Sequence, residues 1–300
     1  MKKITQIISP YFYFNLYVDL KLKIFGLRLY HQKLQGFNIE YWDSKSEKPS
    51  LILIQAFAAE SKFSWFKQVR ILSKTHRLII PNLIYFGNSS MESKSHHLAD
   101  QVNALQELIN HLNLANFSIC GASYGGVIAA ELALQNQAKT KKLVLTNTPF
   151  KYNLESDIQV VLDDLKIANK PLLLAPSNHK ALYLLFRLSY FKNPHVPTFI
   201  FRGIFKNLYL KNKADKQKLI ATATEDLTAL KTKEYPFKLP ILLLWGEHDR
   251  LAPVRIAEEL KVYFGAGAEL IKISKTAHMP NFEKPIKYGK LLRDFLVKEK

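Results

Sequence analysis

Cysteine and glycine are scarce in this sequence. The 300 residues include one cysteine, Cys120, which excludes an intramolecular disulfide and a cysteine-based structural zinc site. Only 11 residues are glycine, whereas 48% are hydrophobic. The fold must therefore be stabilised by core packing, and the length suits one large domain with an insertion. The lack of disulfides fits a reducing environment, so we expect a cytoplasmic protein, either free or peripheral to the inner membrane surface.

Acidic residues are few compared with basic ones. The chain has 25 Asp and Glu against 43 Lys and Arg, which gives a formal net charge of +18. Such an excess favours an acidic partner. Nucleic acid is not expected, because zinc-finger spacing, RNA-binding aromatic motifs and basic heptads are all missing. A solvated lysine-rich surface with no dedicated partner is the alternative.

The sequence also lacks a long uninterrupted apolar run. Lys2 and Lys3 precede an apolar stretch from Ile4 to Val18, but polar residues and a proline break it, and no small-residue cleavage site follows. About 18 consecutive apolar residues are needed to span a bilayer. We therefore interpret residues 1–24 as a retained, amphipathic N-terminal extension rather than a signal peptide or a membrane span.

Short apolar runs alternate with one-sided helical patterns along much of the chain. Leu51–Ile54 and Leu78–Ile80 are typical of buried parallel strands. Leu98–Leu112 has apolar residues at spacings of three and four, which is typical of a helix. The alternation resumes at Ile241–Trp245 and ends with a helix over Pro285–Lys298. It predicts the α/β class, with a mostly parallel central sheet flanked by helices.

One segment departs from this alternation. Between Pro149 and Pro240, helical patterns follow one another with no strand between them. We expect residues 150–238 to form an inserted helical cap. The core is then made of residues 25–149 and 239–300.

The strongest local motif is Gly121-Ala122-Ser123-Tyr124-Gly125-Gly126, a G-x-S-x-G between an apolar strand and a helix of small residues. A serine nucleophile must project from a sharp turn, and flanking glycines let strand and helix approach closely around it. Ser123 would also lie at a helix N-terminus, where backbone N–H groups favour developing negative charge.

These residues resemble the nucleophile elbow of the α/β-hydrolase superfamily, and the resemblance covers nearly all of residues 27–297. The family carries its acid after a later strand and its histidine near the C-terminus, which here correspond to Asp249 and His278. The resemblance implies that His278 removes the proton of Ser123 while Asp249 orients the histidine. Glu283, five residues after His278, is expected to fix the histidine loop. No cofactor and no metal are expected, because the other histidines lack companion ligands at metal-binding spacing.

The resemblance also implies an oxyanion hole made by the backbone N–H groups of Phe57 and Tyr124. Two loops depart from the family pattern. Gln55–Ala58 replaces a His-Gly loop, so both the histidine and the glycine are missing. In the loop from Pro81 to Ser89, Asn82 stands for an acid and Tyr85 for a glycine.

The serine at the elbow argues against the haloalkane dehalogenase and epoxide hydrolase branches, which use an aspartate there. The predicted cap is rich in leucine and phenylalanine, which favours an apolar acyl pocket. The predicted function is hydrolysis of a medium- or long-chain carboxylic ester through an acyl-enzyme, as in lipase-like esterases. The alternatives are a thioesterase or esterase for acyl groups on an acidic carrier protein, a carbon–carbon bond hydrolase, and a non-catalytic binding protein on the same scaffold.

Lysines and aromatic residues coincide in two segments, residues 192–218 of the predicted cap and the N-terminal extension. Two partners would suit this combination, besides the small acyl ester itself. An anionic membrane surface attracts lysines and buries interfacial aromatics. An acidic acyl-carrier protein would be attracted by the cap lysines. Only the first partner depends on the N-terminal extension.

Overall fold

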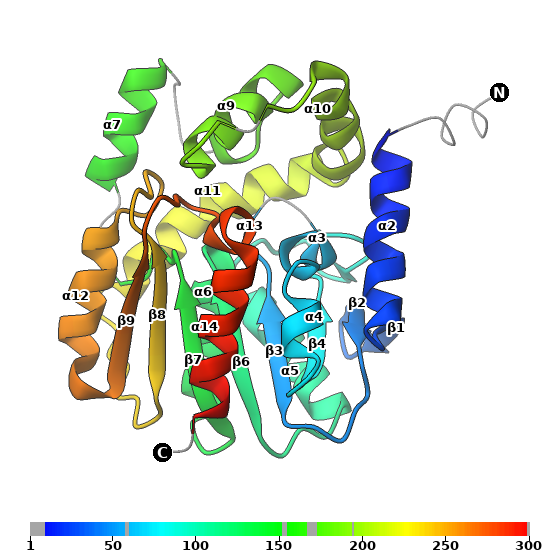
Figure 1. Ribbon diagram of the computed structural model, residues 1–300, viewed down its shortest axis with the longest axis vertical. Helices are drawn as coiled ribbons and strands as arrows, with labels where there is room; N and C mark the ends of the chain where they lie inside the picture. Colours follow the sequence, from blue (N-terminus) through cyan, green and yellow to red (C-terminus); the bar gives the residue numbers. More distant parts are fainter. Residues whose placement is uncertain (1–9, 58–59, 152–154, 167–172, 194, 299–300) are drawn as a thin grey trace.

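A computed structural model describes residues 10–57, 60–151, 155–166, 173–193 and 195–298. In this part of the chain, nine strands form one sheet in the order β1-β2-β4-β3-β6-β7-β8-β9, with β5 paired to β2. The strands from β4 to β9 along this order are parallel, whereas β1 and β2 pair antiparallel. Helices flank the sheet (Figure 1), so the predicted α/β class with a mostly parallel sheet is confirmed.

The central strands are short and almost wholly buried, which explains their continuous apolar sequences. The strands are β1 (Arg28–Leu34), β2 (Phe37–Asp43), β3 (Ser50–Ile54), β4 (Arg77–Pro81), β5 (Ser90–Met91), β6 (Phe117–Ala122), β7 (Thr140–Thr146), β8 (Ile241–Gly246) and β9 (Ala268–Ile273). Each predicted strand is present, with ends that differ by one or two residues.

Helices from distant parts of the sequence pack together over the two faces of the sheet. Helix α4, near the start of the core, contacts α14, the last core helix, and α5 contacts α6. In Figure 1, α14 lies in front of the sheet and α5 behind it. The helices of the core are α3 (Ser61–Trp65), α4 (Val69–Leu72), α5 (Leu98–His111), α6 (Tyr124–Gln135), α12 (Val254–Phe264), the 3-10 turn η2 (Gly265–Gly267), α13 (Pro280–Glu283) and α14 (Pro285–Val297).

Helices also connect β7 to β8. The described part of residues 150–238 contains α7 (Glu155–Leu165), α9 (His179–Ser189), α10 (Thr198–Ile204), the π-helical turn η1 (Phe205–Tyr209) and α11 (Lys213–Leu230), and no strand. They lie above one end of the sheet in Figure 1. Two side-chain pairs attach α11 to the core: His96 Nε2 lies 3.0 Å from Asp215 Oδ1, and His97 Nδ1 lies 3.1 Å from Asp226 Oδ1.

The N-terminal helix α2 (Pro10–Ile24) stands at the side of the molecule beside α3 (Figure 1). Val18 and Leu22 are fully buried on its inner face. Its outer face carries Tyr13 and Leu20, which are also apolar. Apolar side chains therefore lie on both faces of this helix. Residues 1–9 lie outside the described part of the chain.

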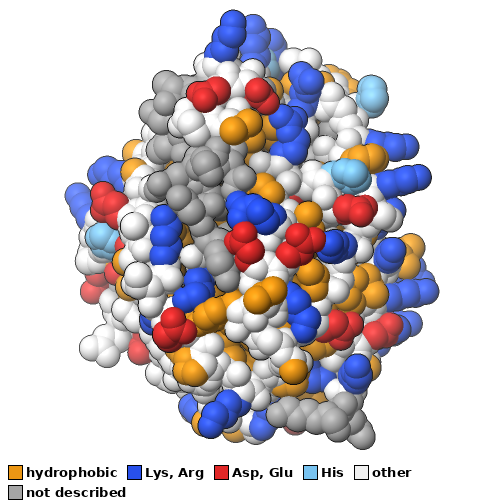
Figure 2. Space-filling model, turned by 90° about the vertical axis from the view of Figure 1, so that its left-hand side faces the viewer, with side chains coloured by type: hydrophobic (Ala, Val, Ile, Leu, Met, Phe, Trp, Pro, Cys, Tyr) orange, Lys and Arg blue, Asp and Glu red, His pale blue; other side chains and the backbone are white. Residues whose placement is uncertain are grey.

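Basic and acidic side chains are interspersed on the side of the molecule that carries α7 and α12 (Figure 2). Within the described residues, no helix is both long enough and apolar enough to cross a membrane.

Candidate active site

Ser123 lies at a sharp turn between β6 and α6. Its φ of +51° and ψ of −124° are unusual for a residue with a side chain. Two hydrogen bonds hold this conformation: the Ser123 N–H donates to Thr146 O at 2.8 Å, and the Ser123 carbonyl accepts from the Gly126 N–H at 2.8 Å. The turn makes Ser123 accessible, whereas the strand residues before it are buried.

The glycines around this turn allow a close approach of backbones. A Cβ atom on Gly121 would lie 2.2 Å from Gly125 O, and one on Gly125 would lie 2.2 Å from Gln55 O. A Cβ on Gly126 would lie 1.9 Å from Thr148 Oγ1. Real side chains do not tolerate such distances, so the glycines are required by packing. Because Gly125 contacts Gln55, the loop that contains Phe57 is brought to the elbow.

The structure brings Ser123, His278 and Asp249 into one hydrogen-bonded array. Ser123 Oγ lies 2.9 Å from His278 Nε2, and His278 Nδ1 lies 2.7 Å from Asp249 Oδ2. The three residues follow β6, β9 and β8, whose carboxyl ends meet at one edge of the parallel sheet. Each separation suits proton transfer or a stable hydrogen bond.

The Asp249 side chain is fully buried, yet its charge is well compensated. Oδ1 accepts from the N–H groups of Leu251 and Ala252 at 2.8 and 3.0 Å. Oδ2 accepts from Asn147 Nδ2 at 2.5 Å in addition to His278. Because both oxygens accept hydrogen bonds from fixed donors, the carboxyl group has only one orientation available.

Asn147 is a site residue that the sequence analysis did not identify. It follows β7 in a left-handed conformation with φ of +47° and is completely buried. Its Oδ1 accepts from the Gly246 N–H at 3.3 Å, while its Nδ2 donates to Asp249. One sequence signal could have identified it. Asn147 is a polar residue that follows an apolar strand, and that strand ends at the same sheet edge as the turn at Ser123.

The loop that carries His278 is fixed from two sides. A Cβ on Gly246 would lie 1.8 Å from Ala277 O, so the loop packs directly on the end of β8. Glu283 accepts from the Ala277 N–H at 2.6 Å, which agrees with the prediction that it fixes this loop. It also accepts from the Phe191 N–H of the cap at 2.8 Å. Burial raises the pKa of the Glu283 carboxyl, and the backbone donors oppose that rise.

An apolar cavity of about 300 Å³ lies between the core and the cap, with Ser123 and His278 in its wall. This volume is at the lower end of the range for small-molecule sites. The cap contributes Leu174, Leu185, Phe186, Ile204, Leu227 and other side chains. The N-terminal helix contributes Phe14. The cavity can therefore receive an apolar group next to Ser123.

Two phenols from the cap, Tyr190 and Tyr209, also line this cavity. Burial raises the pKa of both hydroxyls, and each is raised further by a nearby partner, Glu283 for Tyr190 and Tyr190 for Tyr209. Both are therefore neutral near pH 7. They add two groups that can donate or accept a hydrogen bond to a cavity lined mainly by apolar side chains.

The two residues predicted for the oxyanion hole lie beside Ser123. Phe57 and Tyr124 line the cavity, and their rings meet edge to face at 5.9 Å. Tyr124 is the first residue of α6, so its N–H is one of the donors that the helix itself does not use. Ala58, the last residue of the altered loop, lies outside the described part of the chain.

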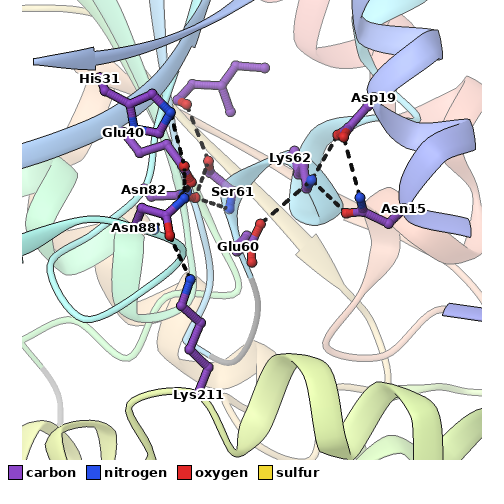
Figure 3. A network of polar contacts seen from close by, with 11 residues as sticks. Asn15, Asp19, His31, Glu40, Glu60, Ser61, Lys62, Asn82, Asn88 and Lys211 are labelled. Atoms are coloured by element: carbon purple, nitrogen blue, oxygen red, sulfur yellow. Dashed lines mark hydrogen bonds and ion pairs between the residues drawn. The ribbon is translucent and has the colours of Figure 1, made fainter. Parts of the chain in front are cut away.

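In the second altered loop, Asn82 and Glu40 form a complementary pair. Asn82 Nδ2 donates to Glu40 Oε1 at 2.6 Å, and Asn82 Oδ1 accepts from the Ser61 N–H and hydroxyl at 2.7 Å each (Figure 3). An amide makes both kinds of bond, whereas an ionised acid could not donate to Glu40. An asparagine at position 82, in place of the family's acid, therefore suits the neighbouring carboxylate of Glu40.

Tyr85 occupies the position where glycine is usual in the family pattern, and it has a positive φ of +74°. Its ring stacks on His96 with centroids 4.8 Å apart, and its hydroxyl donates to Ser95 O at 2.5 Å. These contacts offset the backbone strain of a non-glycine residue.

Comparison with known proteins identifies similar sequences and folds. The family model described as the alpha/beta hydrolase fold matches residues 49–285. Lipase 3 from Moraxella sp. (strain TA144) is 26% identical over 236 residues, which cover 78% of this chain and 72% of the lipase. Epoxide hydrolase 4 from Homo sapiens is 24% identical over 283 residues, 84% of this chain and 73% of that protein.

Among solved structures, that of a membrane phospholipase A described as a bacterial virulence factor has a TM-score of 0.80 and 20% identity. The match covers 92% of this chain and 88% of the phospholipase. At this identity, the match establishes the shared fold.

Proposed function

Because the chain belongs to the α/β hydrolase fold family and is a hydrolase of that class, we propose that it is a serine hydrolase that cleaves carboxylic esters with a medium or long acyl chain. The observation that carries the proposal is the array of Ser123, His278 and Asp249 in the wall of an apolar cavity. The array supplies nucleophile, base and orienting acid, and the cavity supplies room for the acyl chain.

In the first half of the proposed reaction, Ser123 Oγ attacks the ester carbonyl carbon while its proton passes to His278 Nε2. The carbonyl oxygen becomes an oxyanion, for which the N–H groups of Phe57 and Tyr124 are the proposed donors. Asp249 stabilises the imidazolium that forms. The tetrahedral intermediate then collapses, the C–O bond to the alcohol breaks, and the leaving alkoxide takes the proton from His278.

In the second half, water replaces the alcohol. His278 removes a proton from water as the hydroxide adds to the acyl carbon of the ester on Ser123. Collapse of this intermediate breaks the bond to Ser123 Oγ, which takes back the proton from His278. The products are a carboxylic acid and free enzyme.

A serine at this position favours acyl transfer over opening of an epoxide, although an epoxide hydrolase is among the relatives. Attack of Ser123 on an epoxide carbon would produce an ether. An ether has no carbonyl carbon for water to attack, so His278 could not regenerate the enzyme. An acyl-serine ester has that carbonyl, and turnover can be completed.

The apolar lining favours esters of medium or long acyl chains. Each buried methylene contributes roughly 0.8 kcal/mol to binding. The test is a series of p-nitrophenyl esters from acetate to palmitate, with matched thioesters. We expect kcat/KM to rise with chain length to a maximum beyond butyrate. A preference for acetate would contradict the proposed medium or long acyl chain. A preference for thioesters would mean that the substrate is a thioester and not an ester.

A further inference from the structure

The helix α2 presents an unusual concentration of apolar side chains to solvent. Of the 16 large hydrophobic residues that are exposed in the described part of the chain, seven lie on this helix of 15 residues. Five of them recur at spacings of three and four and so share one face. They are Tyr13, Leu16, Tyr17, Leu20 and Ile24.

The opposite face of α2 is fixed to the core, so this apolar stripe points outward. Val18 and Leu22 are fully buried. Lys62 of α3 donates to Asn15 Oδ1 at 2.7 Å and to Asp19 Oδ1 at 2.8 Å (Figure 3). Asp19 is the only acidic residue of the helix, and this ion pair holds it on the inner side.

Lysines flank the outward stripe on both sides. Lys21 and Lys23 are in the last turn of the helix, and their helical positions lie on either side of the line through Leu20 and Ile24. The Lys21 ammonium lies 5.2 Å from the ring centre of Phe66, so its aliphatic stem covers apolar surface. An apolar stripe with lysines along its borders is typical of a helix that lies in the interface of a lipid bilayer.

We infer that the outward face of α2 is a docking surface for an anionic lipid membrane. The stripe inserts between lipid headgroups, and the two lysines contact anionic headgroups at its borders. A net charge of +18 adds long-range attraction to such a surface. The face has no acidic side chain that would oppose it, because Asp19 is turned inward.

Residues 192–218 of the cap, which combine lysines and aromatics in the sequence, expose Phe199 and Leu210 as their large hydrophobic side chains in the described part of the chain, whereas α2 exposes seven. Phe201 and Tyr209 are buried. Lys216 is buried too and donates to Leu208 O at 2.7 Å, whereas Lys211 donates to Asn88 Oδ1 at 2.8 Å. The arrangement therefore favours a lipid surface at α2 over an acidic carrier protein at the cap.

The docking surface is continuous with the cavity. Phe14, at the edge of the outward stripe, lines the cavity and stacks on Phe63 with centroids 5.6 Å apart. Helix α10 of the cap packs against α2 beside it. A lipid acyl chain that leaves the membrane along α2 would enter the cavity past Phe14. This step, unlike docking itself, rests on the proposed ester hydrolase function.

Vesicle co-sedimentation tests the inference. The full chain is mixed with vesicles of equal parts phosphatidylcholine and phosphatidylglycerol, at low and high salt. The variants Tyr13→Glu and Leu20→Glu alter the stripe, and Val262→Glu is the matched control, since Val262 is 82% exposed on α12. Substitutions are preferable to deletion of α2, because deletion would remove the buried contacts of Val18 and Leu22. Turnover of a soluble butyrate ester is measured on each preparation.

We expect the wild type and Val262→Glu to bind vesicles at low salt. Each stripe variant should bind at least about tenfold more weakly than the wild type, because it no longer buries one apolar side chain in the membrane. Butyrate turnover should be equal in all four proteins. Vesicle binding by a protein without esterase activity would support docking and overturn the proposed function. Stripe variants that bind like the wild type would overturn docking. A wild type that binds no vesicles would also overturn docking, and this outcome includes the case in which a second copy of the chain covers α2.

A second pair of variants tests whether the cap lysines contribute to vesicle binding. Lys206→Glu and Lys218→Glu alter exposed cap lysines. We expect only a modest weakening of vesicle binding from either change, because the stripe carries the contact. If these variants abolish binding while the stripe variants retain it, the docking surface belongs to the cap and the inference is overturned.

Discussion

Asn147 donates a hydrogen bond of 2.5 Å to the same oxygen of Asp249 that contacts His278. Without this donor, the buried Asp249 side chain loses one of its hydrogen bonds, and its orientation is no longer fixed. Leaving such a group underbonded costs about 1–3 kcal/mol, which corresponds to roughly tenfold to hundredfold in rate. We therefore expect Asn147→Ala to lower kcat by that factor with little change in KM.

A second variant separates this effect from backbone strain. Asn147 has a positive φ of +47°, which glycine adopts freely and alanine does not. Asn147→Gly should therefore be the more stable of the two variants and should lose the same kcat. Recovery of wild-type kcat in Asn147→Gly would mean that the backbone, and not the side chain, is what matters.

Gly246 and Gly267 provide a matched pair for the packing of the histidine loop. A Cβ on Gly246 would lie 1.8 Å from Ala277 O, whereas the nearest atom to a Cβ on Gly267 is 3.9 Å away. We expect Gly246→Ala to displace the His278 loop, with a loss of at least about 2 kcal/mol in the free energy of unfolding and of most of the activity. Gly267→Ala should keep the free energy of unfolding within about 0.5 kcal/mol of the wild-type value and should leave the activity unchanged. Urea titration and ester turnover measure the two effects, and equal behaviour of the pair would contradict this account of the loop.

Ala223 of α11 lines the cavity, whereas Ala221 on the same helix is exposed. A phenylalanine at position 223 would fill part of the volume that the acyl chain is proposed to occupy. We expect Ala223→Phe to lower kcat/KM for decanoate esters by about tenfold or more and to spare acetate esters, since several methylenes lose their contacts. Ala221→Phe is the control. An equal loss on both esters would place the acyl chain elsewhere.

His76 predicts a loss of stability in acid. Burial, with a smaller contribution from Lys142 and Lys48, lowers the pKa of His76 to about 4 in the folded state, whereas the unfolded chain has the ordinary value of 6.5. Between these values the unfolded state binds the extra proton. The free energy of unfolding should therefore fall by up to about 3 kcal/mol as the pH drops from 6.5 towards 4.

Urea titrations at neutral pH and near pH 4.5 measure this loss. In His76→Gln the decrease should be smaller, because glutamine has no proton to gain. His111→Gln, which alters an exposed histidine, should behave like the wild type. A decrease that is the same in all three proteins would show that other groups cause it.

The core of the fold was predictable because its signals are local. β3 and β4 are continuous apolar runs, and α5 carries its apolar residues on one face, so each reveals its type within a few residues. The ends were less certain, since pairing in the sheet includes polar residues that no apolar pattern marks. Ser50 and Arg77 are such a pair at the start of β3 and β4.

The residues that support the site were harder to predict because they act over long sequence separations. Asn147 contacts Asp249 across 102 residues, and Glu283 reaches Phe191 of the cap across 92. The segments α10 and η1 lie within the predicted helical cap, but their ends could not be predicted, since their sequence is apolar and aromatic without a clear period. The exposure of the cap aromatics was not predictable from their pattern either: Phe201 and Tyr209 are packed inside, whereas Phe199 is exposed.

Labelling by a fluorophosphonate probe tests the central claim most directly. The probe reacts only with a serine that is activated by a base, and Ser123 is the serine 2.9 Å from His278 Nε2. We predict that the wild type is labelled on Ser123, that Ser123→Ala is not labelled, and that His278→Ala is labelled several orders of magnitude more slowly. A folded wild type that resists the probe, or a Ser123→Ala variant that is labelled at the wild-type rate, would contradict the assignment of Ser123 as the nucleophile.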